Sequence, residues 1–276
     1  MRRVLPFVVT SCLAAAVLAI AGTASAQTIE RSGSPWRQKS RGGAGLGSSK
    51  FTFEARFGAY YPEVDEEFGG PGPFTDYFGT GPQFYFGLEL DWTPFRIPYV
   101  GRIGPAFGWG ITTMNGAAKL PGTPADTGED AETQVGPATS LTINAMHLSA
   151  ALRVDEIARR TVIPFVPYAK LGFGFGTWNS GTSAGTSKVG SDCDAPTPQD
   201  CTVAEGMSIG PHIALGGMLG LNWLDPRSGS MARENNGINQ VYVFGEWMWT
   251  NLDAGAGKAP MHIGTSTWVL GLAFDL

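Results

Sequence analysis

After residue 26, the sequence has no apolar run long enough for a membrane-spanning helix, which needs about 20 predominantly apolar residues. It has only three histidines and three cysteines, no H-E-x-x-H motif and no close Cys/His ligand spacing. We therefore predict no metal site, no cofactor and no enzymatic activity. Charge is also scarce, since 16% of residues are charged, and the net charge of −5 argues against a nucleic-acid partner.

The first 26 residues have the order of a secretory signal peptide. Arg2 and Arg3 precede an apolar run from Val4 to Ile20, and Ala24-Ser25-Ala26 supplies the small residues of a cleavage site. A transmembrane helix is the alternative, but the run is short for one. We expect export, with residues 27–49, which mix basic residues with Gly and Ser, forming a flexible periplasmic linker.

Export would place the cysteines in an oxidising compartment, where disulfides form. Cys12 lies inside the apolar run of the signal peptide, so Cys193 and Cys201 remain, on either side of a loop rich in Pro and Asp. We predict a disulfide between these two. Metal binding by so sparse a pair is the weaker alternative.

Two-residue alternation is the strongest signal in the rest of the chain. From Phe51 to Tyr61, apolar residues at the odd positions alternate with polar, charged or small residues such as Glu54 and Arg56. From Gln83 to Trp92, apolar residues at the even positions alternate with a face that carries two carboxylates. Because successive side chains of a strand point to opposite faces, each segment separates an apolar surface from a charged one. Such strands are typical of a transmembrane β-barrel.

The same pattern predicts an all-β fold over residues 50–276, a closed antiparallel barrel of eight strands. The other six strands are expected near Arg102–Met114, Thr139–Asp155, Val166–Trp178, Ile209–Leu224, Val241–Thr250 and Trp268–Leu276. The second of these six is less regular, because its apolar residues change phase between Ile143 and Met146, and this predicts a bulge or a strand start there. Ten strands are the alternative, if the loop at Asn115–Ala138 or at Asn179–Met207 contains a hairpin.

An even strand count is expected to place both ends of the barrel domain in the periplasm, with long outer loops and shorter periplasmic turns. The last predicted strand alternates up to Leu276, and with Gly271 and Phe274 it resembles the C-terminal signal that the bacterial barrel-assembly machinery reads. The expected partners are that machinery, outer-membrane lipid and lipopolysaccharide, and no oligomeric state is predicted.

The inward faces of the predicted strands carry charges of both signs. Because a small barrel is just wide enough for side chains to fill, and isolated charges there would be costly, we predict a paired network. Its predicted members are Glu54, Arg56, Glu89, Arg102, Arg153, Lys170 and Glu246. This network favours a filled lumen. A narrow passive pore is the alternative, because inward glycines such as Gly108 and Gly172 leave room for water.

One short motif points to chemistry. His147-Leu148-Ser149 resembles the H-x-S pair of outer-membrane lipid A deacylases, and residues two apart on a strand share a face, where a proton relay is geometrically allowed. The predicted strand phase turns this face into the lumen, away from lipid, so a polar lining is the preferred interpretation. Acidic clusters in the loops near 63–67 and 126–132 do not match the calcium-binding loop of EF-hands and are expected to be solvated.

Several short segments resemble one known family. They are Tyr61-Pro62, Glu67-Phe68-Gly69-Gly70, Leu88–Trp92, Phe107–Gly110, Leu152–Asp155, Val166–Tyr168, Lys170–Gly172, Gly216–Met218 and Gly264–Trp268. Together they are similar to outer-membrane β-barrel proteins described from myxobacterial genomes, over most of the chain after the signal peptide. The resemblance implies a barrel in the outer membrane. It brings no established transport, enzymatic or adhesive role, and no catalytic residue.

We therefore expect a small outer-membrane barrel of a Gram-negative-type bacterium, with a structural or surface role and a lumen filled by side chains. A porin-like narrow passive pore is the first alternative. A lipid A-modifying enzyme that uses His147 and Ser149 is the second.

Overall fold

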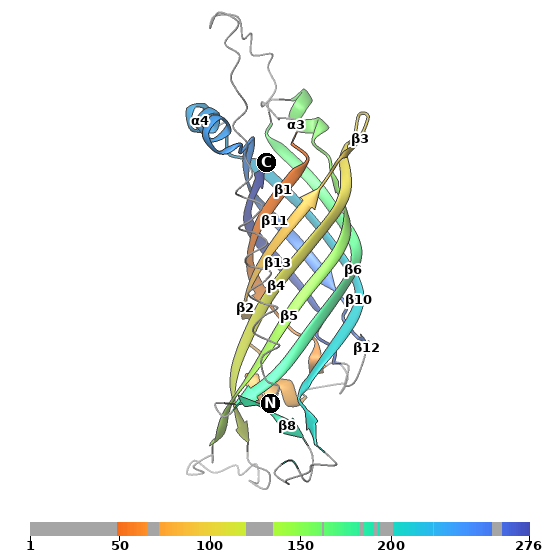
Figure 1. Ribbon diagram of the computed structural model, residues 1–276, viewed down its shortest axis with the longest axis vertical. Coiled ribbons are helices and arrows are strands. Elements are labelled where there is room, and N and C mark those ends of the chain that lie inside the picture. Colours follow the sequence, from red (N-terminus) through yellow and green to blue (C-terminus); the bar gives the residue numbers. More distant parts are fainter. Residues whose placement is uncertain are drawn as a thin grey trace, which may run out of the picture. The chain divides into compact units, whose positions relative to one another are not determined.

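The computed structural model describes residues 49–65, 72–119, 135–161, 163–182, 185–189, 193, 201–222, 224–255 and 261–276. Most of these residues belong to a β-barrel (Figure 1). The predicted signal peptide, and all of the predicted linker except Ser49, lie outside the described residues.

Eight long antiparallel strands make the barrel wall. They are β1 (Phe51–Tyr60), β2 (Gln83–Trp92), β4 (Gly101–Lys119), β5 (Val135–Arg153), β6 (Phe165–Thr182), β10 (Glu205–Gly220), β11 (Gln240–Thr250) and β13 (Thr265–Asp275). Each long strand pairs with the next one along the chain, and β13 pairs with β1, which closes the ring. The predicted closed eight-stranded barrel is confirmed. Closure satisfies the backbone of both edge strands, so no ladder edge is left open.

Side chains alternate between the lumen and the outer surface, as the two-residue period predicts. In β13, for example, Val269 is buried while Trp268 and Leu270 on either side of it are exposed. In β11, the Glu246 side chain points inward and Trp247 lies on the outer face. The burial patterns of β1 and β2 also follow the predicted phase.

The bulge or strand start predicted near residues 143–146 is wrong. The pairing of β4 with β5 runs in regular register from Arg102–Arg153 to Ala117–Ala138, and it shifts only beyond Ala117. Leu141 and Ile143 point into the lumen, although they are apolar. The change of phase in the sequence therefore reflects a change in what fills the lumen, and the strand itself is continuous.

The predicted loops are shorter than expected because β4, β5 and β6 continue into them. The Asn179–Met207 segment does contain paired residues: β7 (Gly185–Thr186) extends the β6 ladder, and β8 (Lys188–Val189) pairs with β9 (Thr202–Val203). Because β8 and β9 form a separate two-stranded sheet, they do not join the wall, and the ten-stranded alternative is wrong.

Short elements mark the two ends of the barrel (Figure 1). We call one end the turn end; it carries β3 (Phe95–Ile97), α3 (Glu156–Arg160) and α4 (Pro226–Asn236). The other, the loop end, carries β8 and β12 (Ala254–Gly255). A further short helix, α2 (Pro73–Phe78), follows β1. None of the described helices is long and apolar enough to cross a membrane.

The ends of α4 have local sequence causes. The Asp225 carboxylate accepts hydrogen bonds from the backbone N–H groups of Arg227 and Ser228, and Gly237 ends the helix in the left-handed conformation with φ 71°. The Ser228 hydroxyl also donates to Asp225, and with these backbone bonds it lowers the pKa of the Asp225 carboxyl. The cap therefore holds an ionised carboxylate at neutral pH.

Candidate functional site

The charged interior of the lumen is the candidate site; six of the seven predicted network residues lie at its centre, and Arg102 lies nearer the turn end. The seven residues come from six strands, β1, β2, β4, β5, β6 and β11, and none is more than 6% exposed. The two-residue alternation explains this placement, because each residue occupies an inward position of its strand.

Glu54 lies between two basic side chains. Arg153 donates to one Glu54 carboxylate oxygen at 2.9 Å, and Lys170 donates to the other at 2.9 Å. The Lys170 Nζ atom also lies 2.6 Å from Glu89 Oε1. Strands β1, β2, β5 and β6 are therefore tied together across the lumen by shared ion pairs.

Arg56 joins the same network from β1. Its guanidinium contacts the carboxylates of Glu89 and Glu246, and its Nε lies 3.9 Å from Glu54. Glu246 also lies 3.4 Å from Lys170 Nζ. Since each of these groups is almost fully buried, each charge depends on its neighbours for compensation.

A second set of contacts lies toward the turn end. Arg102 Nε is 3.1 Å from Asp155 Oδ2, its Nη2 is 3.3 Å from Asp275, and its Nη1 donates to the Ser49 carbonyl. Arg153 reaches Asp275 at 3.2 Å and Asp91 at 2.7 Å. Arg102 is thus in the predicted network, but its partners were not among the predicted acidic members.

The two acidic partners of Arg102 were not predicted, and the sequence indicates their positions to different degrees. Asp275 shares the inward phase of β13 with Val269, so the alternation of that strand could have placed it. Asp155 ends the predicted strand Thr139–Asp155 in the same phase as Arg153, but β5 ends at Arg153, so the contact of Asp155 with Arg102 depends on how the chain folds after the strand.

Glu54, Glu89 and Asp91 also have the spacing of a metal site, since one oxygen from each lies within 4.8 Å of the others. Basic side chains already lie among these oxygens. The Lys170 ammonium contacts Glu54 and Glu89, and Arg153 donates to Asp91 at 2.7 Å. These cations supply the positive charge that a metal ion would otherwise bring.

His147 and Ser149 both face the lumen, at 4% and 5% exposure. His147 Nε2 lies 3.0 Å from Glu89 Oε2, and the His147 ring stacks on His212 with centroids 4.0 Å apart. Within the described part of the chain, the Ser149 hydroxyl has no hydrogen-bond partner. The imidazole therefore interacts with Glu89 and His212, and the geometry of a His–Ser relay is not formed.

His212 completes this arrangement from β10. Its Nδ1 lies 2.9 Å from the Thr250 hydroxyl, and its Nε2 has no hydrogen-bond partner among the described residues. The stacking of His212 on His147 was not predicted, because which inward side chains meet across the lumen depends on strand register.

A G-x-S-x-G string, the pattern around the nucleophile of many hydrolases, spans Gly181–Gly185. In those enzymes the serine sits on a strand-to-helix turn. Here Gly181 and Thr182 of β6 pair antiparallel with Thr186 and Gly185 of β7, so the described residues of the string belong to strands. Ser183 itself lies outside the described residues. The described flanking residues do not include the helix that follows a nucleophile elbow.

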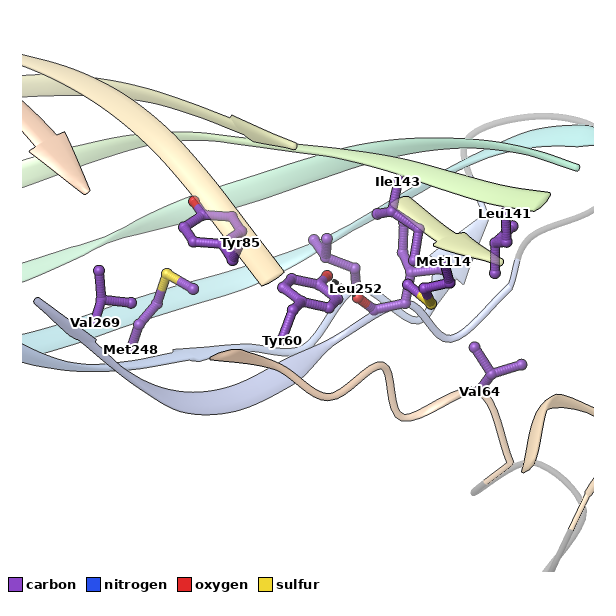
Figure 2. Packing of buried hydrophobic residues seen from close by; sticks show 10 residues of the cluster. Tyr60, Val64, Tyr85, Met114, Leu141, Ile143, Met248, Leu252 and Val269 are labelled. Atoms are coloured by element: carbon purple, nitrogen blue, oxygen red, sulfur yellow. Dashed lines mark hydrogen bonds between the residues drawn. The ribbon is translucent and has the colours of Figure 1, made fainter. Parts of the chain in front are cut away.

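An apolar cluster fills the lumen beyond the two histidines (Figure 2). It contains Tyr60, Val64, Tyr85, Met114, Leu141, Ile143, Met248, Leu252, Ile263 and Val269. Leu252 and Ile263 come from the segment between β11 and β13, and the Tyr60 hydroxyl donates to the Ile263 carbonyl. A smaller apolar cluster includes Tyr168, Met218 and Phe244. The described inward-facing side chains thus form a charged layer and apolar layers.

Cys193 and Cys201 are joined by a disulfide, with Cα atoms 4.9 Å apart. The bridge lies between β8 and β9, in the segment outside the barrel wall. This agrees with the pairing expected for an exported chain.

The solved structures that are similar to this chain include two outer-membrane proteins. The outer membrane protein OprG from Pseudomonas aeruginosa aligns with a TM-score of 0.43 and 10% sequence identity, covering 84% of this chain and 98% of that chain. The N-terminal β-barrel domain of Pseudomonas aeruginosa OprF aligns with a TM-score of 0.34 and 10% identity, covering 83% and 98%. No family model and no curated protein matches the chain. The barrel assignment therefore rests on the strand pairing described above.

Proposed function

We propose that this protein is an outer-membrane barrel with a structural or surface role and a lumen closed by its own side chains. The observation that carries the proposal is the difference between the outer and the inner face of the barrel wall. The outer face is apolar along the strands, while the inner face is occupied by paired charges and by packed apolar groups. The protein thus combines a surface suited to lipid with an interior that leaves little room for water.

The outer face supports membrane insertion. Leu171 and Phe173 on β6 are 63% and 76% exposed, and Leu270 on β13 is 64% exposed. A contiguous surface of such residues would be unfavourable in water, but it matches the hydrocarbon region of a bilayer. The closed ring supplies the other requirement, because no backbone ladder edge faces the lipid.

Aromatic pairs near both ends of the wall support the same proposal. Phe51 and Trp92 stack where β1 begins and β2 ends, with centroids 6.3 Å apart. Trp247 and Trp268 are paired in register on β11 and β13. Aromatic girdles at the two membrane–water interfaces are characteristic of outer-membrane barrels.

The proposed location is the outer membrane of a Gram-negative-type bacterium, reached through a cleaved signal peptide at residues 1–26. The turn end would then face the periplasm and the loop end the exterior, with lipopolysaccharide and outer-membrane lipid around the wall. Insertion would use the barrel-assembly machinery, which would recognise the last strand.

A non-enzymatic role fits the placement of His147 and Ser149. Both are buried in the lumen, away from the lipid-facing surface that a lipid A-modifying enzyme would use. His147 is also engaged by Glu89 and His212. We therefore do not assign them a reaction.

Single-channel recording tests the closed lumen. The protein is refolded, and a difference in SDS-gel mobility between unheated and heated samples verifies that it is folded. It is then inserted into a planar bilayer, and the current is recorded at several salt concentrations. We expect a silent bilayer, because paired charges and the apolar cluster leave no continuous water path. Stable current steps that scale with salt would overturn the closed lumen and support the narrow pore.

A further inference from the structure

The centre of the lumen contains one more carboxylate than basic side chains. The carboxylates are those of Glu54, Glu89, Asp91 and Glu246, and the basic groups are Arg56, Arg153 and Lys170. Asp275 also contacts Arg153, but it is shared with Arg102, which belongs to the turn-end set. The central group is therefore short of one positive charge if every carboxylate is ionised and His147 is neutral.

Such a deficit is costly at this depth. Glu54, Asp91 and Glu246 are each 0% exposed, and one oxygen of Asp91 has no hydrogen-bond partner among the described residues. An uncompensated charge that is removed from water is strongly unfavourable, so a buried cluster of this kind takes up a compensating cation or a proton. Lys170 and Arg153 already lie among the acidic oxygens, which leaves a proton as the smallest compensating ion.

We propose that the His147–Glu89 pair is a buried proton-binding site, and that this proton completes the charge balance of the lumen. His147 Nε2 lies 3.0 Å from Glu89 Oε2, which is the geometry of a charge-assisted hydrogen bond from an imidazolium. With His147 charged, four carboxylates face four cations. The proton site rests on the filled lumen proposed above, since water in the lumen would compensate the same charge.

The surroundings of His147 on each strand favour one proton there. Arg56 of β1 and Lys170 of β6, which share Glu89 with His147, oppose a charge on the ring, whereas the Glu89 carboxylate of β2 favours it. On β4 the facing residue is Gly108, which has no titratable group, and a Cβ atom there would overlap the His147 ring. On β11, the Thr250 hydroxyl is hydrogen-bonded to the neighbouring histidine, His212.

His212 limits the site to a single imidazolium. Its ring lies parallel to that of His147, with an interplanar angle of 12° and centroids 4.0 Å apart. A charged ring stacked on a neutral aromatic ring is favourable, whereas two charged rings at this distance would repel each other. The proposed resting state therefore has His147 charged and His212 neutral.

Nitrogen-15 NMR of histidine-labelled, refolded protein in lipid nanodiscs reads these states directly. The two ring nitrogens of an imidazolium resonate close together, whereas those of a neutral ring are well separated. We expect one imidazolium and one neutral ring from the lumen at pH 7.5, assigned by loss of signals in His147→Gln and His212→Gln. A neutral His147 at this pH would overturn the assignment.

Glu246→Gln provides the decisive comparison, because it removes the surplus carboxylate with little change of shape. The proton affinity of His147 should fall by about tenfold or more, because Arg56 and Lys170, which Glu246 shares with Glu89, would then compensate Glu89 without the imidazolium. Glu156→Gln at the turn end is the matched control and should leave that affinity unchanged. If His147 titrates over the same pH range in the wild type and in Glu246→Gln, the proposal is overturned. This comparison does not use the His147 variant, so it remains valid even if that variant does not fold.

Two further outcomes distinguish a bound proton from a bound metal cation and from water in the lumen. If a metal cation supplies the charge, chelation and dialysis will change the His147 signals, and that result would overturn the proton site. If the barrel conducts in planar bilayers, the closed lumen fails and the charge argument for the proton site fails with it, whereas a silent barrel with a neutral His147 overturns the proton site alone.

Discussion

Arg56 illustrates how single residues hold the lumen together. It is 1% exposed and contacts three carboxylates, those of Glu54, Glu89 and Glu246. Lys170 contacts the same three carboxylates and already neutralises part of their charge, so it cannot also replace the charge of Arg56. Removing one buried partner is therefore costlier than removing a surface charge.

Arg56→Ala is predicted to lower the free energy of unfolding by about 3–5 kcal/mol, because it leaves buried carboxylates without their cation. Urea unfolding in lipid vesicles, followed by tryptophan fluorescence, measures the loss. Arg227→Ala, at an exposed site on α4, is the control and should change the value by no more than about 0.5 kcal/mol. Similar values for the two variants would argue against a buried charge network.

At the residue scale, sequence reasoning selected the inward charges but not their full set of partners. Alternation alone selects Glu54, Arg56 and Lys170, because it needs only neighbours along the chain. The contact of Lys170 with Glu54 joins residues 116 positions apart, and the period does not reveal it. The stack of His147 on His212 depends on strand register in the same way.

Individual strands have two environments, and the energetic cost of a substitution depends on which side it faces. On β6, Lys170 is buried within the charge network, while the next residue, Leu171, is exposed on the outer wall. Strand β5 is continuous, yet its inward face changes from charged and polar near Arg153 to apolar at Ile143 and Leu141. The prediction of a bulge assumed that the inward face would be polar throughout.

Leu171→Arg is predicted to destabilise the barrel by about 2–4 kcal/mol in a lipid bilayer, because a charge on the lipid face is poorly solvated near the membrane midplane. Asn179→Arg, on the same outer face but near the loop end and opposite Glu205, should cost only about 0–1 kcal/mol. Urea titration of both variants in the same vesicles makes the comparison. Equal costs at the two positions would contradict a membrane-spanning β6.

The barrel is held by ring closure and by the side chains that meet inside it. Closure joins β1 to β13, pairing Thr52 with Asp275 at opposite ends of the barrel sequence. The disulfide between Cys193 and Cys201 lies outside this ring, between β8 and β9. Barrel integrity should therefore depend on the wall and the charge network, and only weakly on the bridge.

Replacing both Cys193 and Cys201 with serine is predicted to leave the folded barrel intact, because the bridge closes only the short segment between them. Loss of the bridge can cost at most about 2–3 kcal/mol through chain entropy, which is less than the loss expected for Arg56→Ala. Heat-dependent migration on SDS gels, with and without reductant, reports the outcome. Loss of the folded band on reduction alone would show that the bridge supports the wall.

The sequence by itself determined the strands and which face of each points outward, because a two-residue period is a local property of the chain. It could not determine how the lumen is filled. The meeting of Arg102 with Asp155, the stacking of the two histidines, and the apolar layer around Tyr60 and Ile263 depend on register between strands and on segments that fold back between them. These contacts arise only when the ring closes, because closure brings residues far apart in the chain to the same level of the barrel.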